Sequence, residues 1–137
     1  MSEEEDRMHY FICSSNNPIV IRKKNNEMFS KIYIDDIIIH NEDNISLTKD
    51  LVSLEISENV DANYERFGKS QNRIIGLFHP NLAFSAWNKE NGSLMLFSND
   101  NSYSFSQTHE ISLYFKENAS GNLLDFKNIS IIIIYSF

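Results

Sequence analysis

Residues 129–135, Ile129-Ser-Ile-Ile-Ile-Ile-Tyr135, are the most hydrophobic run of the chain and decide its fold class. β-Branched side chains pack well on a pleated surface, so this run predicts a β-strand. Residues 111–115 predict a preceding strand, because apolar and polar residues alternate there. A polar segment with Gly121 separates the two, and we therefore expect a hairpin. Four consecutive isoleucines leave no polar face, which predicts cover on both sides of this sheet.

The rest of the chain repeats the pattern of short strands between polar turns, without a clear amphipathic helix. Asn91-Gly92 predicts a type I′ turn, because both residues tolerate positive φ. Residues 58–72 predict a surface loop. The sequence therefore predicts an all-β, antiparallel β-sandwich. We expect its other strands at residues 9–13, 19–21, 28–40, 51–57, 73–78, 82–87, 93–97 and 103–105.

Asp35 and Asp36 interrupt the apolar alternation of residues 28–40 at its centre. A one-residue slip would turn the following apolar set to the other face, so the pair predicts a β-bulge or a corner. The same pair could contribute to a calcium site, but calcium needs at least about six oxygens from converging segments. The bulge is the simpler interpretation.

Length and charge predict one domain with an acidic arm. The chain has 137 residues and a net charge of −7, and four acidic groups fall within its first six residues. We expect residues 1–8 to be a disordered arm and residues 9–137 to form the domain. The acidic start is unlike a signal peptide, and no apolar run is long enough to span a membrane.

The distribution of basic residues argues against a nucleic-acid partner. A phosphate-binding face needs clustered lysine and arginine, and the nearest approach is Arg22-Lys-Lys24, followed by two asparagines. Such a short triplet is typical of a solvated loop. We expect neither nucleic-acid nor membrane binding.

No group of residues predicts catalysis, a metal site or a cofactor. The four histidines fall singly, and we expect Cys13 to be a small core residue. Trp87 and Tyr103 are candidate ligand contacts, since aromatics line carbohydrate grooves in lectin-like sandwiches. The alternative is that Trp87 packs in the core.

Two isoleucine runs predict an oligomer. Each places apolar side chains on both faces of its strand, and a two-sheet sandwich covers only one. A loop of the same chain, residues 58–72, or the surface of another subunit could cover the other face. We expect a homo-oligomer, a ring of three or five copies. The predicted interface residues are Ile37, Ile39, Ile132 and Ile134.

Residues 110–135 resemble the closing hairpin of minor capsid (penton) and related virion proteins of virophages and polinton-like viruses. Those proteins end with a strand, an acidic-x-x-Gly loop, a Leu-Asp-Leu-like step and a last β-rich strand. Two features depart from that pattern: the loop is one or two residues longer, and the chain has room for no insertion domain. The matching positions are residues 111–115, Glu117, Gly121, Leu124-Asp-Phe126 and residues 129–134.

The resemblance implies a single jelly roll that acts as a viral structural protein. The expected role is a minor capsid, penton-like, spike or cement subunit that self-assembles and contacts other capsid proteins. Its location would be the virion, and the host cytoplasm during assembly. The alternative is a lectin-like or trimeric ligand-type β-sandwich binding module, and a metal-dependent enzyme of the double-stranded β-helix kind ranks third.

Overall fold

The computed structural model describes residues 9–41, 51–58, 73–79, 86–87, 93–98, 100–125 and 129–137. These residues are almost all in β-strands, with one short 3₁₀ turn at Lys24–Asn26. The strands are β1 (His9–Ser14), β2 (Ile19–Arg22), β3 (Phe29–Asn41), β4 (Val52–Glu58), β5 (Arg73–Phe78), β6 (Ala86–Trp87), β7 (Leu94–Leu96), β8 (Ser102–Thr108), β9 (Glu110–Glu117) and β10 (Ile129–Ser136).

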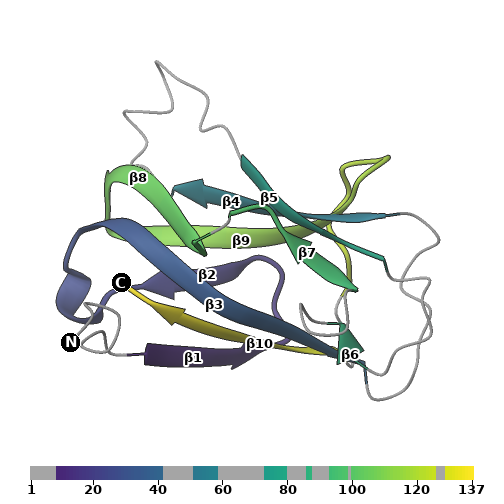
Figure 1. Cartoon of the computed structure of the whole chain (residues 1–137), viewed down its shortest axis with the longest axis horizontal. Helices are drawn as coiled ribbons and strands as arrows, with labels where there is room; N and C mark the ends of the chain where they lie inside the picture. Colours follow the sequence, from purple (N-terminus) through teal and green to yellow (C-terminus); the bar gives the residue numbers. More distant parts are fainter. Residues whose placement is uncertain are drawn as a thin grey trace.

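The strands form two antiparallel sheets that face each other as the layers of a sandwich (Figure 1). The first sheet has the order β1-β10-β3-β6, and β8 pairs with another part of β3. The second sheet has the order β2-β9-β4-β5-β7. The predicted all-β sandwich is therefore confirmed.

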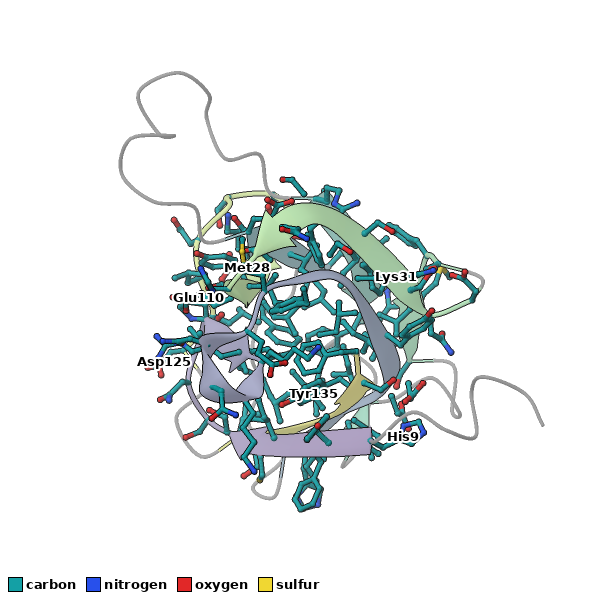
Figure 2. The ribbon with its side chains drawn as sticks, turned by 90° about the vertical axis from the view of Figure 1, so that its left-hand side faces the viewer. His9, Met28, Lys31, Glu110, Asp125 and Tyr135 are labelled. Atoms are coloured by element: carbon teal, nitrogen blue, oxygen red, sulfur yellow. The ribbon has the colours of Figure 1, made fainter. Side chains whose placement is uncertain are left out.

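The core lies between the two sheets and is filled by the inward-facing residues of both. In β4, Val52, Leu54 and Ile56 are at most 1% exposed, which follows the period-two alternation of its sequence. In β10 the inward set is Ile129, Ile131, Ile133 and Tyr135. Figure 2 shows side chains filling the space between the layers, with Tyr135 inside and His9 at the rim.

The predicted bulge at the aspartate pair is confirmed. Ile134 pairs with Asp36, but the next residue, Tyr135, pairs with Ile34, so Asp35 is an extra residue in β3. This extra residue restores the inward direction of the apolar set on both sides of it. The four inward isoleucines, all 0% exposed, are Ile32, Ile34, Ile37 and Ile39.

The predicted hairpin between the last two strands is wrong. β9 pairs with β2 and β4 in the second sheet, whereas β10 pairs with β1 and β3 in the first. Each is a central strand whose two neighbours come from elsewhere in the chain, so neither strand has an edge left on which to pair with the other. The chain turns after β9, where Gly121 has φ +75° as the turn prediction requires, and crosses to the other sheet.

Some predictions lie outside the described residues. These are the disordered arm at residues 1–8, the loop at 59–72, the strand at 82–85 and the turn at Asn91-Gly92.

Candidate functional site

The outward side of the first sheet carries an apolar surface that its registers define. Residues directly opposite each other in a sheet project to the same side. Cys13 pairs with Ile132, which in turn pairs with Ile38. Phe11 pairs with Ile134 one row further along. We call these five residues the outer apolar face: Phe11, Cys13, Ile38, Ile132 and Ile134.

Phe11 is the most exposed member of the outer apolar face. Its side chain is 75% exposed, the highest fraction among the large hydrophobic residues that the structure describes. Cys13 is also exposed, while Ile38, Ile132 and Ile134 are half-buried. The second sheet lies on the opposite side and covers the inward residues instead. A large aromatic ring exposed to water beside other apolar side chains marks a contact surface.

Polar groups border the outer apolar face at one end. The imidazole Nδ1 of His9 lies 2.8 Å from the carboxylate Oδ2 of Asp35, the bulge residue. Asp36 accepts a hydrogen bond from the backbone N–H of Ile37 at 2.9 Å through its own carboxylate. The bulge therefore does two things: it keeps β3 in phase with the core, and it places one carboxylate within reach of β1.

The structure divides the four predicted interface residues into two pairs. Ile132 and Ile134 lie on the outer apolar face. Ile37 and Ile39 do not, because both point into the core of their own chain and are 0% exposed. Ile38, between them, takes the outward position. Counting the alternation from the bulge would have predicted that Ile38 points outward. The sequence gives no such indication for Phe11, because β1 has apolar residues on both faces.

Of the two predicted ligand contacts, only Tyr103 has a side chain within the described part of the structure. Tyr103 is 7% exposed and belongs to the core, so its ring is not available to a ligand. Burial raises the pKa of its phenol, an effect that the nearby Ser98 backbone partly opposes. Trp87 lies on β6, where its backbone pairs with Ile39, but its side chain lies outside the described part of the structure.

An aromatic cluster that sequence reasoning missed closes one end of the sandwich. Phe137 lies 4.8 Å from Phe29 and 5.6 Å from Tyr135, measured between ring centroids. Tyr10 stacks on Tyr135 at 5.6 Å, and Phe105 meets Phe29 edge-on at 6.4 Å. Because these rings come from four separate strands or their ends, no local sequence pattern predicts the cluster. The cluster brings rings near the beginning, the middle and the end of the described chain into contact.

Two cations flank the aromatic cluster. The Lys23 ammonium lies 5.6 Å from the ring centre of Phe137, and the Arg73 guanidinium lies 5.0 Å from that of Phe105. Arg73 also donates a hydrogen bond to the carbonyl oxygen of Ser104 at 2.6 Å. Since Arg73 belongs to the second sheet and Ser104 to the first, this arginine ties the layers together.

The outward side of the second sheet is mixed in character. Ile74 and Met95 are 50% and 57% exposed, but they border a polar centre. There the Lys116 ammonium lies 3.5 Å from the Glu55 carboxylate and 5.3 Å from the ring centre of Tyr114. The two outward faces therefore differ, and the first sheet carries the more continuous apolar surface.

The described residues hold no group of three or more His, Cys, Asp or Glu side chains placed to bind a metal ion.

Cys13, expected in the core, is instead exposed on the outer apolar face, because it occupies an outward position of the edge strand β1. His109 Nδ1 lies 2.9 Å from the backbone carbonyl oxygen of Asn26.

One exposed carboxylate has a strongly lowered pKa. Hydrogen bonds from the Ser102 and Ser98 hydroxyls and from the Ser102 backbone N–H bring the pKa of Asp100 down to about 2. These bonds close the turn before β8, in which Asn101 has φ 61°. The arrangement is a turn-stabilising motif.

Within the described residues, no helix has the length and hydrophobicity needed to cross a membrane. No protein-family model, curated protein or solved structure matches the chain. The outer apolar face is therefore the candidate site that the geometry supports best.

Proposed function

We propose that the chain is a single jelly roll and a structural subunit of a virus particle, of the minor capsid, penton-like, spike or cement kind. The strand order supports the jelly roll. In that fold the first strand lies beside the last and the last beside the third, while in the opposite sheet the second lies beside the penultimate strand. Here β1 lies beside β10 and β10 beside β3, while β2 lies beside β9, followed by β4 and β5. The short strands β6 and β7 are additions at the sheet edges.

The outer apolar face is the observation that carries the structural role. A subunit of a particle keeps apolar surface for its neighbours, and such surface is otherwise unfavourable in water. Phe11, at 75% exposure, offers roughly 150 Å² of ring and backbone surface to a partner. The proposed role works through contacts alone, so it calls for no catalytic residue and no cofactor.

The partners in this proposal are further copies of the chain and other capsid proteins. The patch of five residues is smaller than the roughly 800 Å² that each partner of a stable pair contributes. Contacts of this size hold together when many are made at once, as in a closed shell. The proposed location is the virion, and the host cytoplasm during assembly.

Two observations test the structural role without relying on self-association. The gene should lie beside genes for a major capsid protein or a packaging ATPase. Particles purified from the source should contain the protein in a constant ratio to the major capsid protein, measured by quantitative mass spectrometry. Abundant protein in infected cells with none in purified particles would refute the proposal.

A further inference from the structure

The edges of the two sheets differ in how well they are protected against pairing with another strand. An edge strand exposes unpaired backbone N–H and C=O groups, and proteins block such edges with charged side chains, proline or short length. β6 and β7 are short, with two and three residues. β2 has four residues, follows Pro18 and ends at Arg22, which is paired with Glu110 at 3.2 Å.

The edge strand β8 is blocked by side chains from the other sheet. Its Ser104 carbonyl oxygen accepts a hydrogen bond from Arg73 at 2.6 Å. Its Ser106 N–H donates to the Glu58 carboxylate at 3.2 Å, and the Ser106 hydroxyl donates to the same carboxylate at 2.9 Å. Charged groups therefore occupy backbone positions that an incoming strand would need.

β1 has none of these protections among the described residues. It is six residues long, His9-Tyr-Phe-Ile-Cys-Ser14, and holds no proline, lysine, arginine or acidic residue. Of the strands that the structure describes, it pairs with β10 alone. Its exposed residue Phe11 joins the outer apolar face of the same sheet.

We propose that the free edge of β1 pairs antiparallel with β1 of a second copy of this chain, across a two-fold axis. The partner must be an extended strand, because the groups that the edge leaves unpaired are those of a β-ladder. The strand is complementary to itself, since no like charges would meet in an antiparallel pair. The two outer apolar faces would then join into one surface.

The proposed pair rests on the proposed function, because it specifies one contact of a self-assembling subunit. A two-fold contact can join two single copies of the chain. It can also join two of the predicted rings of three or five copies, in addition to the contacts within each ring. In an isologous pair each β1 meets the same residues of its partner, so a change at Phe11 acts twice in every contact.

The test is a lysine substitution at Phe11 with a matched control. Phe11→Lys places two cations beside each other at the proposed edge, whereas the exposed side chain has no role in the core. Phe97, 48% exposed beyond β7, gives the control Phe97→Lys. Sedimentation velocity at tens of micromolar should show association of the unmodified protein and of Phe97→Lys, and a mass reduced by half for Phe11→Lys. If the unmodified protein forms a simple pair, Phe11→Lys should have the 16.0 kDa mass of one chain.

Hydrogen exchange provides a second measurement that reports on the backbone. Pairing should slow the exchange of β1 amides as the protein concentration rises, and Phe11→Lys should abolish that change. Association with no added protection of β1 amides would overturn the inference and leave the structural role intact. A monomer at every concentration would also overturn the inference, while the particle content would still decide the structural role.

Discussion

The side chain of Asn17 pairs with the backbone of Phe115 as a neighbouring strand would. The Phe115 N–H donates to Asn17 Oδ1 at 3.0 Å, and Asn17 Nδ2 donates to the Phe115 carbonyl oxygen at 2.8 Å. The same Nδ2 donates to the Leu124 carbonyl oxygen at 2.9 Å. One amide thus extends the ladder between β2 and β9 and fixes the segment that leaves β9.

Asn17→Ala should therefore destabilise the fold although it removes few atoms. The substitution removes three part-buried hydrogen bonds and leaves backbone groups unsatisfied, so we expect a loss of about 2–3 kcal/mol in the free energy of unfolding. Urea denaturation measures it. Asn16→Ala, at the exposed neighbouring position, should change stability by less than about 0.5 kcal/mol. Equal effects of the two substitutions would contradict the pairing role.

Gly76 is required by the close approach of β5 and β7. A Cβ atom at this position would lie 2.6 Å from the Met95 carbonyl oxygen and 2.9 Å from Leu96 Cδ2. The carbonyl belongs to the backbone of the paired strand, so Gly76→Ala should cost about 1–3 kcal/mol and speed hydrogen exchange in β7.

Gly121→Ala is the matched comparison, because its cost has a different origin. A Cβ atom there would meet nothing within 4 Å, but φ is +75°. The left-handed backbone alone should cost about 1 kcal/mol and leave exchange in β7 unchanged. Faster β7 exchange in both variants would refute the steric explanation for Gly76.

Phe137 should be worth more to stability than its position at the end of the described chain suggests. Its ring contacts Phe29, Tyr135 and the Lys23 ammonium at one end of the sandwich. Because the ring is half-buried, Phe137→Ala should lower the free energy of unfolding by about 2 kcal/mol. Thermal unfolding measures this loss. Phe97→Ala, at an exposed ring, should cost less than about 0.5 kcal/mol in the same experiment.

Asp100 should make stability depend on pH in the acid range. Its folded pKa is about 2, below the ordinary value of 3.8, so its contribution is present above pH 4 and is lost as pH falls toward 2. The unmodified protein should exceed Asp100→Asn in unfolding midpoint at neutral pH, and the difference should shrink between about pH 4 and pH 2. A difference that stays constant over this range would show that the carboxylate charge plays no part.

The sequence predicted the strands and their inward faces well because both depend on local alternation. The period-two pattern identified Val52, Leu54 and Ile56 as one face, and parity alone required an extra residue near Asp35. Pairing is a different matter. Which strands become neighbours depends on contacts across the whole chain, so adjacency in sequence suggested a hairpin where β9 and β10 in fact enter different sheets.

The candidate surface was only partly predictable for the same reason. Ile132 and Ile134 followed from the unbroken isoleucine run, but the exposure of Cys13 depends on β1 being an edge strand. The burial of Tyr103 depends on the packing of β8 over the core, which its short alternating segment did not reveal.

The bulge itself provides the sharpest test of the fold. Deletion of Asp35 removes the extra residue, and Ile34, Asp36 and Ile37 then follow one another in regular alternation. Ile32 and Ile34, both 0% exposed, therefore keep the same inward direction as Ile37 and Ile39. Tyr135 can stay opposite Ile34, and Ile134 opposite Asp36, in an uninterrupted ladder with β10. We expect the deletion variant to keep the same core and to unfold cooperatively in urea.

Asp35→Ala separates the residue count from the charge. It retains the bulge and removes only the partly exposed contact with His9, so its cost should stay below about 1 kcal/mol. A deletion variant without cooperative unfolding would contradict the assignment of Asp35 as the extra residue. A large loss in Asp35→Ala would mean that the carboxylate contributes more than its contact with His9 accounts for.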